Sequence, residues 1–270
     1  MLSPAAHSTP WVLGVVFALL LAGLAVNAIR KGRREYRRFT RMRSTIPRQK
    51  MFRRWLVQSM LVFGGSAAVV LVLVWQFVPL FVADVNAWRW IVDARRTFDA
   101  SGAFALGLAV GIPLAVVALS VLGIVLARRE TEVPAIGNIQ ALLPRNRAEL
   151  PHGAALSINA GVVEELLFRL ALPALIFGFT GNSVVAIVVS LVVFGLLHVY
   201  QGVWGVVGSM ILGALLMAIY LATGSILLAI VAHALIDLRS LVLIPVVVFR
   251  AHTLPANATP PPATEQPLRR

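Results

Sequence analysis

Two adjacent glutamates and an arginine stand inside one of the most apolar parts of the chain, in the stretch VVEELLFRLAL at residues 162–172. Two histidines and an aspartate follow, in FGLLH (194–198) and HALID (233–237). Between residues 151 and 249 the only Lys, Arg, Asp or Glu residues are Glu164, Glu165, Arg169, Asp237 and Arg239. Each ionisable side chain at mid-bilayer costs at least about 2.5–3.5 kcal/mol, so such residues usually serve a function.

The two glutamates have different surroundings on a helix. Glu165 and Arg169 are four residues apart with the acid first, so they can form an ion pair that fixes helix packing. Glu164 points about 100° away from Glu165 and gains no partner on its own helix. A carboxylate without a structural partner is a candidate general base, and Glu164 is therefore the first candidate for catalysis.

The histidines are also placed at one-turn spacing. Phe194 and His198 are four residues apart, as are His233 and Asp237, and a carboxylate one turn away can orient an imidazole. Either histidine alone could be an ordinary core residue. Together with Glu164 they could activate a water by general base catalysis or hold a divalent metal such as zinc. We expect Glu164, His198 and His233 to share one hydrated pocket, with Asp237 as a further metal ligand.

The composition indicates that these residues lie in a membrane protein. Hydrophobic residues make up 59% of the 270 residues and charged residues only 13%, with a mean hydropathy of +0.86. These values predict an all-α polytopic helical bundle, because lipid leaves no partner for unpaired backbone groups. The chain has no cysteine, which excludes disulfides and thiolate metal sites.

The hydrophobic pattern predicts seven transmembrane helices, or eight if the last one breaks near residues 237–240. Gly-containing turns should separate the later spans, at TGNS, QGVW and ATGS. The segments between spans, including residues 84–101 and 128–150, are predicted to be loops. The seven predicted spans are 11–29, 56–83, 102–127, 152–179, 183–200, 204–222 and 225–249.

Four regions follow from this pattern. Residues 1–54 form an N-terminal span and a basic cytoplasmic loop, residues 55–150 hold two further spans and a connecting segment, and residues 151–250 hold the chemically active core. The Pro-rich residues 251–270 are expected to be a disordered tail. The N-terminus is predicted to lie outside, since the positive charges follow the first span.

The basic run at residues 30–54 carries twelve Lys or Arg residues against one Glu and accounts for most of the net charge of +13. Between two apolar spans such a run indicates a cytoplasmic loop that contacts anionic lipid. No nucleic acid partner is expected.

The three motifs EELLFR, FGLLH and HALID resemble the EExxxR, FxxxH and HxxxN/D motifs of the CPBP family, the CAAX protease and bacteriocin-processing (Abi) intramembrane proteases related to type II CAAX prenyl proteases. The motifs occur in the family's order within residues 150–250. The absence of HExxH, GxSG and GxGD disfavours the zinc site-2, rhomboid-like and presenilin-like protease classes.

The resemblance implies an intramembrane endopeptidase, often labelled a metalloprotease, acting on a membrane-associated peptide or protein. Glu164 would activate water, with His198 as its partner or as a metal ligand. His233 and Asp237 would hold a metal or stabilise the oxyanion, with Glu165, Arg169 and Phe194 in support. Asp237 stands where relatives often carry Asn, and an ionised Asp cannot donate to an oxyanion. Asp237 is therefore expected to bind a cation or to orient His233.

Two other functions remain open from the sequence. A non-catalytic scaffold or immunity-type protein could keep this fold, and buried Glu and His residues also serve proton-coupled transporters. The richness in Ala, Val and Arg suggests a bacterial source and the inner membrane.

Overall fold

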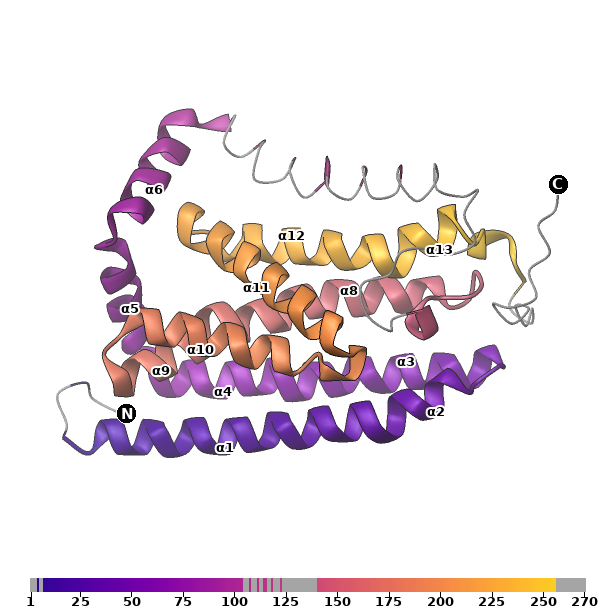
Figure 1. The fold of residues 1–270 in the computed structure, drawn as a ribbon, viewed down its shortest axis with the longest axis horizontal. Coiled ribbons are helices and arrows are strands. Elements are labelled where there is room, and N and C mark those ends of the chain that lie inside the picture. Colours follow the sequence, from indigo (N-terminus) through magenta and orange to yellow (C-terminus); the bar gives the residue numbers. More distant parts are fainter. Residues whose placement is uncertain are drawn as a thin grey trace.

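The protein is described here by a computed structural model, which describes residues 4, 7–103 and 140–255 together with 107, 111, 114, 115, 118 and 122. Within these residues the secondary structure is helical throughout, as the composition predicted, and no strand occurs. The long helices lie roughly parallel or antiparallel in an elongated bundle, with α11 crossing it obliquely (Figure 1).

The N-terminal half of the bundle is a helical hairpin. The first arm runs from α1 (Thr9–Arg30) through a π-helical stretch (Lys31–Tyr36) into α2 (Arg37–Thr40). The second arm comprises α3 (Thr45–Ser59), a π-helical stretch (Met60–Gly64) and α4 (Gly65–Val74). Nε1 of Trp55 on the second arm donates to Oε2 of Glu35 on the first at 2.8 Å, which joins the arms near their turn.

The prediction of a basic loop at residues 30–54 is wrong, because most of this segment is helical and only residues 41–44 form the turn. Arg and Lys are good helix formers, so charge alone does not break a helix. Apolar residues at helical spacing give the hairpin tip its own small core, in which Phe39, Phe52 and Trp55 pack together with Met51. Arg37, Arg38, Arg41, Arg43 and Lys50 are exposed on the outside of this tip, whereas Arg48 is buried.

Two helices cross the other end of the bundle. The predicted span 56–83 is interrupted at residues 75–76, after which α5 (Phe77–Asn86) follows, and α6 (Arg89–Ser101) occupies most of the segment predicted to be a loop at 84–101. The mixed charge of α6 suggested a loop, but its apolar and polar residues fall on opposite helical faces. Arg95 links α6 to the helix Val203–Thr223, because its Nε donates to the backbone oxygen of Leu221 at 2.9 Å.

The C-terminal half begins with a short 3₁₀ turn (Gln140–Leu142) and a long helix. That helix comprises α8 (Leu150–Glu165), a π-helical stretch (Leu166–Ala171) and α9 (Leu172–Thr180). It is followed by α10 (Ser183–Leu196), a 3₁₀ turn (Val199–Gln201) and α11 (Val203–Thr223).

The last helix comprises α12 (Ile226–Leu238), a π-helical stretch (Arg239–Leu243) and α13 (Ile244–Val247), and a 3₁₀ turn (Ala251–Thr253) follows. The helix continues through residues 237–240, so the predicted break that would give an eighth span is absent there.

The three predicted turns are confirmed as helix boundaries. Gly181 and Gly224 end α9 and α11 in the left-handed conformation, with φ of +64° and +68°, which a glycine adopts without steric cost. Asn182 and Ser225 then cap the next helices, because their side-chain oxygens accept from the backbone N–H groups of Val185 and Leu228.

Small residues bring α8 and α12 into close contact. A Cβ added at Gly161 would lie 2.9 Å from the backbone oxygen of Ile230 and 3.0 Å from the Cβ of Ala234. A Cβ added at Gly153 would lie 2.6 Å from the backbone oxygen of Leu241. Glycine at both positions lets the two helix backbones approach, which is common between membrane helices.

Four helices of the described residues are long and apolar enough to cross a membrane: Thr9–Thr40, Thr45–Val74, Val203–Thr223 and Ile226–Val247. The helices Phe77–Asn86 and Ser183–Leu196 are apolar but shorter. The predicted span 102–127 lies mostly outside the described residues, and residues 128–139 and the tail from residue 256 lie wholly outside them. The count of seven spans therefore stays a prediction.

Candidate active site

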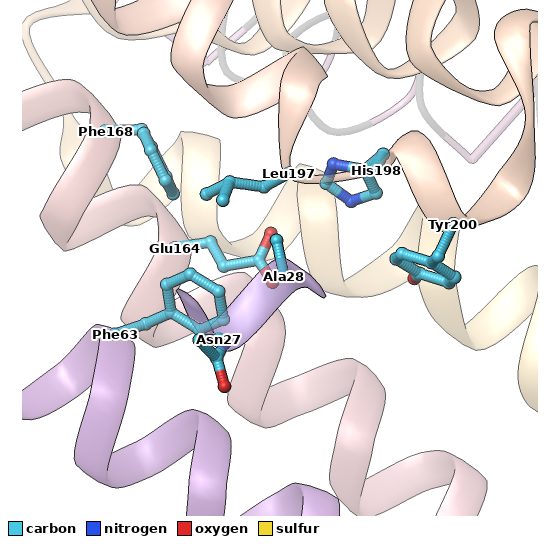
Figure 2. A pocket seen from close by; sticks show the side chains of 8 residues that line it. All are labelled: Asn27, Ala28, Phe63, Glu164, Phe168, Leu197, His198 and Tyr200. Atoms are coloured by element: carbon cyan, nitrogen blue, oxygen red, sulfur yellow. The ribbon is translucent and has the colours of Figure 1, made fainter. Parts of the chain in front are cut away.

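One pocket brings two of the expected catalytic residues together. Glu164 of α8 and His198, which follows α10, line a cavity of about 40 Å³ that a few water molecules would fill. Figure 2 shows the carboxylate of Glu164 directed into the space bordered by His198 and Leu197. The remaining lining residues are Asn27, Ala28, Phe63, Phe168 and Tyr200.

The short length of α10 places His198 at the depth of Glu164. The 14 residues of α10 span about 21 Å at 1.5 Å per residue. It begins at the end of the bundle where α9 ends, so it stops well before the hairpin tip at the opposite end (Figure 1). Glu164 lies 16 residues before Thr180, the last residue of α9, so it is about 24 Å from that same end of the bundle and close to the depth of His198.

The tautomer of His198 follows from its backbone contact. Its Nδ1 lies 2.9 Å from the carbonyl oxygen of Phe194, one turn earlier on the same helix. A carbonyl oxygen can only accept, so Nδ1 carries the proton, and in the neutral ring Nε2 has a lone pair that can accept a proton. The one-turn spacing in FGLLH thus serves to orient the histidine.

Glu164 and Glu165 occupy contrasting environments. Glu164 is half-buried and has no hydrogen-bonding or ion-pairing partner among the described residues. Glu165 is fully buried and bridges two partners, with Oε2 at 3.0 Å from Nε of Arg169 and Oε1 at 2.7 Å from Nδ1 of His233. The expected ion pair of Glu165 and Arg169 is present, and it includes His233 as a third member.

Arg169 fixes this buried network to two further elements. Its Nη2 donates to the backbone oxygen of Gly213 on α11 at 3.3 Å, and its guanidinium carbon lies 4.8 Å from the centre of the Phe194 ring. Arg169 belongs to the π-helical stretch that begins directly after Glu165, and π-helical turns frequently occur at functional sites.

Phe194 contacts both histidines, but only one of them lines the pocket. Its ring centre lies 5.0 Å from that of His198 and 6.3 Å from that of His233. His233 is 3% exposed and does not line the cavity that contains Glu164 and His198. The expected sharing of one pocket therefore holds for Glu164 and His198, whereas His233 lies outside the pocket lining.

Asp237 lies near His233 but contacts it less closely than Glu165 does. Its Oδ2 is 3.8 Å from Nε2 of His233, and its side chain is partly exposed. The sequence suggested that Asp237 orients the imidazole. In the structure Glu165 makes the hydrogen bond that fixes the ring, and the sequence spacing did not reveal this partner, 68 positions away.

The arrangement of these side chains does not match a metal centre. The metal ligands considered from sequence were Glu164, His198, His233 and Asp237. Within the described ranges no three His, Cys, Asp or Glu side chains are grouped so as to hold an ion, and Nδ1 of His233 is bound to Glu165. A catalytic zinc normally has three protein ligands.

The N-terminal hairpin contributes residues that the motifs did not reveal. Asn27 and Ala28 of α1 line the pocket, as does Phe63 from the π-helical stretch before α4. Tyr200 adds a further polar group, and its ring stacks on His198 at 6.1 Å and contacts Tyr36 of the first arm at 5.7 Å. Asn27 is a polar residue in an apolar part of α1, and this polarity is the one sequence signal that could have shown that the hairpin lines the pocket.

Comparison with known proteins identifies the segment that holds the motifs. No match is found among curated proteins or among solved structures. A family model described as type II CAAX prenyl endopeptidase Rce1-like matches residues 146–239, which include all three motifs and about a third of the chain. This match confirms the resemblance to the CAAX proteases that the motifs indicated.

Proposed function

We propose that the protein is an intramembrane endopeptidase in which Glu164 activates water with the help of His198. The observation that carries this proposal is the pocket that the two side chains line from α8 and the end of α10. The match of residues 146–239 to a prenyl endopeptidase family supports peptide-bond hydrolysis as the reaction class.

The proposed chemistry needs only groups that face the pocket. The carboxylate of Glu164 accepts a proton from a water molecule as its oxygen attacks the scissile carbonyl carbon. Nε2 of His198 has a lone pair that can accept a hydrogen bond from the same water and hold it in position. The proton then passes from Glu164 to the amine nitrogen as the peptide C–N bond breaks, which restores the carboxylate.

The buried network has a positioning role in this proposal. Glu165 and Arg169 fix the helix turn that presents Glu164, and Glu165 holds His233 by a hydrogen bond. Asp237 extends this network towards the protein surface, where a cation could still bind to it. No step of the mechanism passes through a metal, and the requirement for one stays a prediction.

The substrate is a peptide or protein held at the membrane. A farnesylated CAAX peptide is the first probe, since the matched family is described as a prenyl endopeptidase family. We expect wild-type protein in detergent to cleave it and Glu164→Gln to reduce kcat at least about 100-fold, as loss of a general base does. Undiminished turnover by Glu164→Gln would refute this mechanism.

The placement in the membrane is also a proposal. We assign the hairpin tip, with exposed Arg37, Arg38, Arg41, Arg43 and Lys50, to the cytoplasmic side and to anionic lipid. Because the chain has no cysteine, single cysteines at Arg41 and Thr97 can report sidedness. An impermeant maleimide added to intact bacterial cells should label Thr97→Cys and not Arg41→Cys, and the reverse pattern would invert the topology.

A further inference from the structure

A polar side chain from the N-terminal helix faces the proposed catalytic pocket. Asn27 lies on α1, far outside the family-matched residues 146–239, yet it lines the same cavity as Glu164 and His198. Around it α1 is apolar, and a half-buried amide in such a helix is costly unless it is hydrogen-bonded. The presence of a polar side chain at position 27 therefore needs an explanation.

One half of the Asn27 amide already has a partner. Nε2 of Gln58 on α3 donates to Oδ1 of Asn27 at 2.6 Å, which links the two arms of the hairpin. Figure 2 shows the amide oxygen of Asn27 directed away from Glu164. Because Oδ1 of Asn27 accepts from Gln58, Nδ2 of Asn27 is the amide atom whose N–H groups can donate to a ligand.

The pocket needs such a donor. Hydrolysis of a peptide bond places negative charge on the carbonyl oxygen, and donors preorganised around that oxygen lower the barrier. The carboxylate of Glu164 can only accept hydrogen bonds. The neutral tautomer of His198 donates its one N–H to the carbonyl oxygen of Phe194. Among the lining side chains, Asn27 carries N–H groups beside the oxygen that accepts from Gln58, and Tyr200 carries a hydroxyl whose oxygen accepts from Gln201.

We infer that Asn27 is a substrate-binding residue whose amide nitrogen donates to the scissile carbonyl oxygen, so that α1 completes the active site of the Rce1-like segment. This inference rests on the proposed hydrolysis of peptide bonds. It assigns to the N-terminal hairpin a direct part in the reaction in addition to its place in the membrane. The oxyanion donor then comes from α1, and Asp237 need not supply it.

Substitutions can separate donation from helix packing. Asn27→Asp keeps an oxygen that accepts from Gln58 but has no N–H group, and Asn27→Ala is its uncharged counterpart. Gln58→Ala removes the bond between the arms and keeps the Asn27 donor. Asn159→Ala is the matched control, because Nδ2 of Asn159 donates to Oγ of Ser59 at 2.8 Å between α8 and α3 without lining the pocket.

The measurements are kcat and KM on the farnesylated CAAX peptide, together with the Kd of a phosphonate analogue of that peptide that mimics the tetrahedral intermediate. We expect Asn27→Asp and Asn27→Ala each to lower kcat about 100-fold, as for loss of one oxyanion donor, and to weaken analogue binding similarly. KM should change little. Gln58→Ala should lower kcat less than tenfold and Asn159→Ala should not lower it.

The outcomes distinguish this inference from the proposed function. Full kcat in Asn27→Asp with a loss in Gln58→Ala would show that the residue only joins the two arms, and would overturn the inference. A loss in Tyr200→Phe with full activity in both Asn27 variants would assign the donor to Tyr200 and also overturn it. If wild-type protein neither cleaves the peptide nor binds the analogue, the proposed function has failed first and the inference falls with it.

Discussion

Nδ1 of His233 lies 2.7 Å from Oε1 of Glu165, so the second glutamate of the EE pair reaches across from α8 to α12 and holds a histidine of another motif. Its neighbour Glu164 lines the pocket, which His233 does not. Two adjacent carboxylates on one helix therefore occupy different environments, and only Glu164 takes part in the proposed chemistry.

This relationship predicts different effects for substitutions at the two neighbouring glutamates. Glu164→Gln should abolish cleavage and leave the thermal unfolding temperature unchanged, because the carboxylate has no partner among the described residues. Glu165→Ala should lower the free energy of unfolding by about 3–5 kcal/mol, since it leaves the Arg169 charge buried. Peptide turnover and unfolding in detergent measure the two effects, and equal destabilisation by both variants would contradict the assignment.

A single added side chain between α8 and α12 should disturb the site from a distance. In Gly161→Val the new Cβ would meet the backbone oxygen of Ile230 at 2.9 Å, so the helices must separate. We expect a loss of about 1–3 kcal/mol in stability and a fall in kcat, because His233 moves away from Glu165. Gly65→Val is the control, since nothing lies within 4 Å of a Cβ added there, and an equal loss of kcat in both variants would argue against this route.

A buried ion pair at the hairpin tip should hold the two halves of the chain together. Nε of Arg48 lies 3.0 Å from Oε1 of Glu149, and both side chains are excluded from solvent. Glu149→Leu should cost about 3–5 kcal/mol, whereas the double variant Arg48→Met with Glu149→Leu should recover most of that loss. A double-mutant cycle measured by unfolding in detergent checks this, and additive losses would show that the pair is not coupled.

Chelation should leave the enzyme active. The described Glu and His residues do not form a three-ligand site, so we expect cleavage of the farnesylated peptide to survive dialysis against EDTA, with kcat changed less than twofold. Elemental analysis of the dialysed protein gives the accompanying metal content. Activity that disappears on dialysis and returns with added zinc would show that the metal expected from the family resemblance is required.

The sequence predicted best the features that depend on local chemistry. The helical fold, the glycine turns at Gly181 and Gly224 and the pairing of Glu165 with Arg169 follow from composition and one-turn spacing. The basic segment was predicted to be a loop because its charge dominates the pattern, although Met51, Phe52 and Trp55 are spaced so that they share one buried face of α3. Local periodicity there was a better guide than charge.

The rest depends on pairings between distant parts of the chain. Glu165 lies 68 residues from His233, and Asn27 is more than a hundred residues from Glu164, so no spacing rule connects them. One-turn spacing suggested Asp237 as the partner of His233, but the close approach of α8 and α12 at Gly161 provides a nearer carboxylate.

The shortness of α10 has a consequence for the surrounding bilayer. A helix of 14 residues covers about 21 Å, whereas the hydrocarbon layer is about 30 Å thick. We expect lipids beside α10 to compensate for this hydrophobic mismatch by local thinning. The headgroup region and its water would then lie closer to His198. A hydrolytic reaction could take its water from this thinned part of the bilayer.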